Sequence, residues 1–125
     1  MAKFTDDSVL DAALAEIATA TRMVVTSAQP ANFAGIAAVA LADVVLTAGL
    51  GGGDFTAADG DTSGRKVTVA AQSGVNVDAS GDATHVCLDD GTTLLQVTTC
   101  TTQTLTSGNT VNVPAYDIEF ADVTA

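Results

Sequence analysis

The sequence predicts a mainly β fold: a β-sandwich or jelly-roll-like domain of seven to eight short strands with one N-terminal α-helix. From Thr21 onward, short runs rich in β-branched residues alternate with a period of two. Turn-forming glycine, asparagine and aspartate residues separate these runs at near-regular intervals, as in sandwiches and barrels. The 125 residues are enough for one core. We divide them into an N-terminal helix or arm, residues 1–20, and a β-sandwich domain, residues 21–125.

The N-terminal helix is predicted over residues 6–19 because apolar side chains recur there at helical spacing. These apolar positions are Leu10, Ala13, Leu14 and Ile17. Thr5 is the expected hydroxyl cap, followed by two aspartates at the positive end of the helix dipole. A helix this short is marginal alone, so its apolar stripe must dock on another surface. We expect it to grip a neighbouring subunit.

The strands follow in order. The run FAGIAAVALADVVLTAGL, residues 33–50, is apolar on both faces and interrupted by Asp43, which predicts a strand covered from both sides rather than a membrane span. Beyond the flexible connector GLGGGD, two runs carry a valine at every second position, which predicts strands whose valines face inward. In the final run, three residues at alternate positions share one face. The inward residues are Val67, Val69, Val75 and Val77, and the final three are Tyr116, Ile118 and Phe120.

A hairpin is predicted at Asp90-Gly91, whose residue types favour a two-residue type I′ turn. That turn pairs Leu88 with Thr93 and places Gly81 opposite Cys100. Cys87 and Cys100 then lie about 20 Å apart along the ladder, whereas a disulfide needs Cα atoms within about 7 Å. We therefore predict two free thiols.

His85 is the only histidine, and in this hairpin it points to the same face as Cys87. A Cys–His pair is geometrically conceivable, but a nucleophilic site also needs an orienting carboxylate. One histidine and two distant cysteines are too few ligands for zinc. The sequence favours a half-exposed or hydrogen-bonded strand histidine.

Two acidic clusters are candidate cation sites. Asp54, Asp59 and Asp61 surround a glycine-rich loop, and Asp89 and Asp90 form the hairpin tip. Calcium prefers alternating carboxylates, but the complete EF-hand pattern is missing. We expect solvated turn residues, with a weak cation at a subunit contact as the alternative. No catalytic, cofactor-binding or metal-binding residue is assigned, and no cofactor is expected.

The charge balance excludes two classes of partner. Fifteen acidic and four basic residues give a net charge of -11. The bases cannot displace the counterions of a nucleic acid, and an anionic membrane would repel the chain. The acidic start shows no signal peptide, so synthesis in the cytoplasm is expected. Only 15% of residues are charged, against about 25% in an ordinary domain, so we expect broad apolar surface patches.

Four stretches within residues 54–122 carry a family resemblance: GDTSGRKVTV, ATHV, DGTTLL and LTSGNTVNVPAYDIEFAD. They resemble small virion proteins encoded in the structural-gene clusters of tailed bacteriophages. The resemblance implies a non-enzymatic capsid decoration or cement protein on the outer surface of the head. It would be made in the host bacterial cytoplasm, bind the major capsid protein and associate with itself as a homotrimer.

The alternative within this resemblance is a tail or head appendage protein that takes part in host-surface adhesion. Such a protein would expose aromatic residues at loop tips, and Phe55 and Tyr116 are the candidates. An enzyme is the third possibility, but no catalytic constellation can be assembled from these residues.

Overall fold

The computed structural model describes residues 5–51 and 53–122. The fold is mainly β, as predicted, with 50% strand and 15% helix, but it has about nine strands rather than seven or eight. In chain order the elements are α1 (Asp7–Ile17), β1 (Arg22–Thr26), the 3-10 helix η1 (Phe33–Gly35), α2 (Ile36–Val39), β2 (Ala40–Val45), β3 (Phe55–Asp59), β4 (Arg65–Val69), β5 (Gln72–Asn76), β6 (Gly81–Asp89), β7 (Leu94–Leu105), β8 (Thr110–Val113) and β9 (Tyr116–Phe120). None of the helices in these residues is long and apolar enough to cross a membrane.

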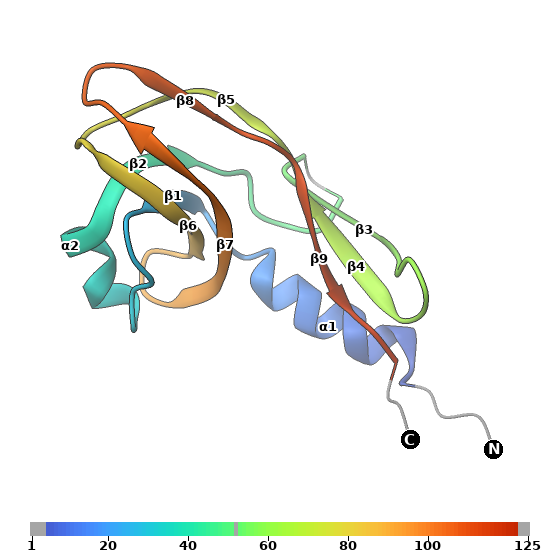
Figure 1. The fold of residues 1–125 in the computed structure, drawn as a ribbon. Coiled ribbons are helices and arrows are strands. Elements are labelled where there is room, and N and C mark those ends of the chain that lie inside the picture. Colours follow the sequence, from blue (N-terminus) through green and yellow to red (C-terminus); the bar gives the residue numbers. More distant parts are fainter. Residues whose placement is uncertain (1–4, 52, 123–125) are drawn as a thin grey trace.

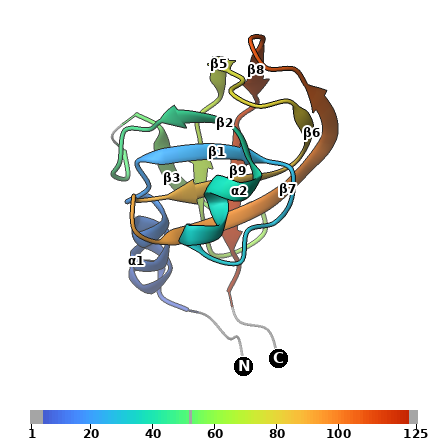
Figure 2. The same cartoon turned by 90° about the vertical axis from the view of Figure 1, so that its left-hand side faces the viewer.

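The strands form three antiparallel sheets in a sandwich-like arrangement (Figures 1 and 2). One sheet has the order β2-β1-β6-β7, the second β3-β4-β9, and the third pairs β5 with β8. The third sheet meets the first where Ala42 bridges to Val77. The first sheet is therefore continued at its β2 edge, whereas β7 is an edge strand at the opposite side.

The second and third sheets are two parts of one bent ribbon. Val69 pairs with Tyr116, and beyond the bend Gln72 pairs with Val113, so the register does not change. Pro114 lies between the paired segments, where its lack of an N–H costs no ladder bond. The long ribbon that results runs along one side of the molecule (Figure 1).

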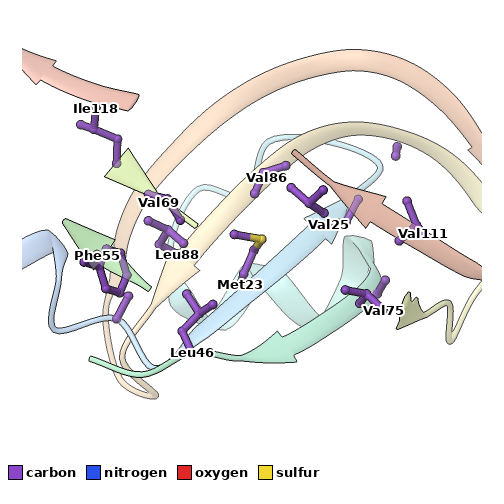
Figure 3. Close-up of a cluster of buried hydrophobic side chains, with 14 of the residues drawn as sticks. Met23, Val25, Leu46, Phe55, Val69, Val75, Val86, Leu88, Val111 and Ile118 are labelled. Atoms are coloured by element: carbon purple, nitrogen blue, oxygen red, sulfur yellow. The ribbon is translucent and has the colours of Figure 1, made fainter. Parts of the chain in front are cut away.

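The main core is enclosed by this ribbon, the four-stranded sheet and α1 (Figure 3). Its largest fully buried side chains include Phe55, Leu14, Met23 and Leu88. The predicted inward valines, Val67, Val69, Val75 and Val77, are all buried, which confirms the alternation inferred for those strands. The face shared by Tyr116, Ile118 and Phe120 also packs against this core.

The helix α1 begins one residue later than predicted and is capped by Asp6 rather than Thr5. The Asp6 carboxylate accepts a hydrogen bond from the Ser8 N–H at 3.0 Å and also bonds the Ser8 hydroxyl. These bonds satisfy an N–H that the first helical turn leaves unpaired. The apolar stripe of the helix docks on its own domain, because Leu14 and Ile17 belong to the main core. That the helix also grips a neighbouring subunit stays a prediction. The division at residue 20 stays a prediction.

The interpretation of residues 33–50 as one buried strand is wrong. The Asn32 carboxamide accepts from the Gly35 N–H at 2.9 Å and starts η1, which α2 continues. Ile36 in α2 packs with Val24 and Cys87 in a second, smaller apolar cluster. Of this segment only β2 is a strand, and it is not covered from both sides, because Val45 is 81% exposed.

Leu14→Ala tests whether α1 is an integral part of the domain. Leu14 is fully buried, so we expect the free energy of unfolding to fall by about 2–5 kcal/mol. Val9→Ala, on the exposed side of the same helix, should change it by less than about 0.5 kcal/mol. Urea denaturation followed by circular dichroism measures both. Equal, small effects would show that α1 packs only loosely on the β domain.

Candidate functional site

The hairpin that carries the cysteines and the histidine is closed by a longer turn than predicted. Asp89 pairs with Leu94 and Leu88 with Gln96, so the expected pairing of Leu88 with Thr93 is wrong. The Asp90 carboxylate accepts hydrogen bonds from the N–H groups of Thr92 and Thr93, at 3.0 and 2.7 Å. These bonds lower the pKa of Asp90. Only Gly91 has a positive φ here, so a type I′ turn, which needs two such residues, does not form.

Both cysteines are free, as predicted. Cys87 is fully buried in the second apolar cluster, with its sulfur 3.8 Å from the Thr26 hydroxyl. Cys100 is half-buried on β7 and packs against the main core. The pKa of each thiol is raised, chiefly because burial disfavours the thiolate. Neither sulfur has the low pKa of an activated nucleophile.

His85 bonds its sequence neighbour rather than a thiol. Its Nδ1 lies 2.8 Å from the Thr84 hydroxyl. Across the sheet, His85 pairs with Thr26 of β1 and Thr99 of β7. This is the hydrogen-bonded strand histidine that the sequence favoured.

The loop acids are held by donors from the protein. The Asp54 carboxylate accepts from the Thr47 N–H at 2.6 Å and from the Gln72 amide at 3.1 Å. Asp59 and Asp61 form ion pairs with Arg65 and Lys66, at 2.7 and 2.8 Å. Within the described residues, no three potential ligands gather as a metal site would require.

Asp89 is not a solvated turn residue, because it is completely buried. Its carboxylate receives the Arg22 guanidinium at 2.9 Å and the Gly91 N–H at 3.0 Å. The pair fixes the hairpin end to β1. A buried carboxylate needs such partners, because desolvation without them is costly.

The basic residues that the structure describes are all engaged in ion pairs. Arg65 contacts Asp11 of α1 at 2.8 Å in addition to Asp59, and Lys66 contacts Asp117 of β9 at 3.3 Å in addition to Asp61. The pKa values of Arg65 and Lys66 are raised, chiefly by hydrogen bonds to these carboxylates. The cations therefore tie the protein's own elements together, and acidic groups dominate the surface.

Large apolar side chains form no broad exposed patch in the described residues, and the expectation for smaller apolar residues stays a prediction. Among the described residues, only Val9 and Val45 are large apolar side chains with high exposure. The aromatic candidates for an adhesion site are not exposed loop-tip residues either. Phe55 is fully buried, and the Tyr116 hydroxyl is buried without a hydrogen-bond partner.

The remaining candidate site is a groove between two unpaired strand edges. The outer edge of β7 faces β8 and β9 across this groove, which we call the seam groove. Figure 1 shows the ribbons of these three strands. It consists of two hollows of about 240 and 360 Å³. Both hollows are lined by Val86, Cys100, Thr101, Val113 and Pro114. Sequence reasoning missed this groove. The available signal was the run from Gly91 to Tyr116, which contains no charged residue.

A shallow hollow also lies between η1 and the β6–β7 turn, with a volume of about 480 Å³. Its lining runs from Ala31 to Ala34 and from Thr92 to Leu94. None of these side chains is ionisable, so the hollow provides no acid–base chemistry.

Comparison with known proteins adds no relative. No family model matches the chain, and no curated protein or solved structure gives a significant match.

The burial of Cys87 predicts a selective alkylation pattern. In the folded protein at neutral pH, iodoacetamide should modify Cys100 slowly and leave Cys87 unmodified, because the thiolate is the reactive form. Denaturant should expose both thiols. Tandem mass spectrometry locates the label, because trypsin leaves both cysteines in one peptide, residues 67–125, and Cys100→Ala is the control. Rapid labelling of native Cys87 would contradict its burial. A change in electrophoretic mobility on omitting reductant would contradict the two free thiols.

Asp43 provides a test of local charge repulsion. Its pKa is raised by loss of solvation first, and then by a hydrogen bond with Asp78 and the negative charge of that carboxyl. A raised pKa in the folded state disfavours folding above the unfolded-state pKa, and this cost disappears as pH falls through the folded pKa. Asp43→Asn should therefore raise the melting temperature at pH 7, and the difference from wild type should close in acid.

Thermal unfolding at about pH 7 and about pH 3.5 measures this effect. Asp7→Asn is the matched control, because it removes one negative charge beside the positive end of a helix dipole. An equal gain from both substitutions would assign the effect to net charge rather than to the Asp43–Asp78 pair.

Proposed function

We propose that the chain is a bacteriophage capsid decoration (cement) protein that binds the outer surface of the head and stabilises contacts between capsomers. Its partners are the major capsid protein and, in a homotrimer, further copies of itself. The observation that carries the proposal is the edge of β7. This strand is 12 residues long, is paired only with β6, and contains no charged residue or proline. Natural proteins protect such edges unless another chain covers them.

The charge distribution supports a place on the outside of a shell. The net charge is -11, and the described bases are occupied by internal ion pairs. Such a surface is repelled by packaged DNA but is compatible with a cationic protein surface. The resemblance of residues 54–122 to phage virion proteins points to the same setting.

A decoration role needs a rigid unit and no reaction chemistry. Many copies on one particle convert modest individual contacts into a large total stabilisation. The proposal therefore gives no catalytic role to His85, which bonds Thr84, or to Cys87, which lies in an apolar cluster. The appendage alternative predicted exposed aromatic residues at loop tips, and its candidate Phe55 is buried.

The proposal predicts saturable binding to phage heads and a gain in head stability. Heads assembled without this protein should bind it on mixing, and their rupture temperature should rise with occupancy. Sedimentation with heads measures binding, and dye uptake by released DNA measures rupture. A matched amount of an unrelated acidic protein of similar size is the control.

Two outcomes would contradict the cement role. Heads that do not bind the protein, or that bind it and rupture at the same temperature, would exclude stabilisation. Particles that stay intact without the protein but fail to adsorb to host cells would support the appendage alternative.

A further inference from the structure

We propose that the seam groove receives an extended, lysine- or arginine-containing segment of a partner chain, which pairs with β7 as an added strand. The partner named here, a shell subunit, rests on the proposed function. The groove and its ligand chemistry rest on the observations below. An added strand gains main-chain hydrogen bonds from an exposed edge and specificity from pockets for alternate side chains.

The first observation is that β7 differs from the other edges. The outer side of β2 carries Asp43 and is bridged to Val77, and β3 carries Asp59. The edge strand β9 carries Asp117 and Glu119. Charges and coverage of this kind prevent pairing with foreign strands. The strand β5 is also uncharged, but the Ala42–Val77 bridge to β2 lies at its end, whereas the facing edges of β7 and β8 have neither charge nor cover among the described strands.

The second observation is the shape of the groove. Side chains of the core, including Val25, Ala83 and Val86, line its inner part, and β7 and β8 line its sides. The smaller hollow, about 240 Å³, lies below the range of about 300–1,000 Å³ typical of small-molecule sites, and the larger, about 360 Å³, lies at its lower end. The hollows therefore suit individual side chains of an extended segment better than a separate small ligand.

The third observation is the unpaired Tyr116 hydroxyl. Tyr116 lines the larger hollow, and its hydroxyl is buried with no partner among the described residues. An unpaired buried polar group is unfavourable and calls for an explanation. The hydroxyl has almost no accessible surface, so the Tyr116 ring must turn toward the hollow before a backbone carbonyl of an incoming strand can accept the phenolic proton and remove this cost.

Charge selects the partner. A second copy of the chain carries the same net charge of -11. The groove itself is almost neutral, but acidic side chains lie near it: Asp82 beside the C-terminal part of β7, and Asp117 on β9, whose carboxylate also contacts Lys66. Lysine or arginine flanking a run of small or β-branched residues would complement this pattern. Binding should weaken as salt screens the attraction.

The test uses the full chain and a yeast-displayed library of random 12-residue peptides. Selection should enrich peptides that alternate β-branched residues and carry lysine or arginine. Amide shifts and hydrogen-exchange protection measured by NMR with an enriched peptide should cluster at residues 98–103 and 111–117. No enrichment, or shifts confined to another surface, overturns the inference.

Two substitutions sharpen the test. Cys100→Phe fills both hollows and should weaken the peptide by about tenfold or more, whereas the control Cys100→Ala leaves the groove open and should bind like wild type. Tyr116→Phe should weaken binding by about 2- to 10-fold without lowering the stability of the free protein. If Cys100→Phe fails to fold, Tyr116→Phe and the NMR map still decide. Unchanged affinity in Tyr116→Phe together with shifts outside the groove overturns the inference.

The same variants separate this inference from the cement role. Heads that bind Cys100→Phe and wild type equally would overturn the seam as the docking surface but leave the decoration function intact. Peptides that bind the seam of a protein that heads do not bind would exclude the cement role and retain the strand-addition site. Sedimentation of the protein alone measures its oligomeric state. A dimer that forms in wild type but not in Cys100→Phe would identify a second copy as the occupant of the groove and would overturn the inference of a cationic partner.

Discussion

The fold depends on the register that the bent ribbon keeps across its bend, where β4 pairs with β9 and β5 pairs with β8; an irregularity follows the bend between Gln72 and Val75. One register on both sides of the bend directs Val67, Val69, Val113 and Ile118 into the same core. Asp54 holds the bend: its carbonyl accepts from the Ala70 N–H at 2.8 Å, and its carboxylate accepts from Gln72. A shift by one residue would turn the whole valine set outward.

The same ribbon produces the seam groove. Its outer edge passes β7 without pairing, and Pro114, which has no N–H to donate, lies on that edge beside the groove. On the other side, the register irregularity between Ala83 and His85 bends the β6–β7 hairpin. Two edges that do not join therefore lie at the boundary of a well-packed core. The weakly protected surface and the rigid interior have a common structural origin.

Much of the fold could be predicted from local pattern. Alternating valines identified β4 and β5, and the helical spacing of Leu10, Leu14 and Ile17 identified α1. The prediction of a strand over residues 33–50 failed, because a short alanine-rich run has no periodicity that distinguishes a helix from a strand. The Asn32 cap favours a helix at its start. The hairpin register depended on the side-chain bonds of Asp90, which compete with the turn expected from residue type. The seam groove requires tertiary contacts between strands distant in sequence.

The internal use of cations has a consequence for assembly. Arg22, Arg65 and Lys66 stabilise contacts within the domain, so these bases leave little positive charge for contacts between copies. Neighbouring copies on a particle would repel each other over distances of about 8–10 Å at physiological salt. An array would therefore be held by the surface beneath it rather than by contacts among copies. In this view binding to the shell comes first, and trimer contacts form only where that surface compensates the acidic charge.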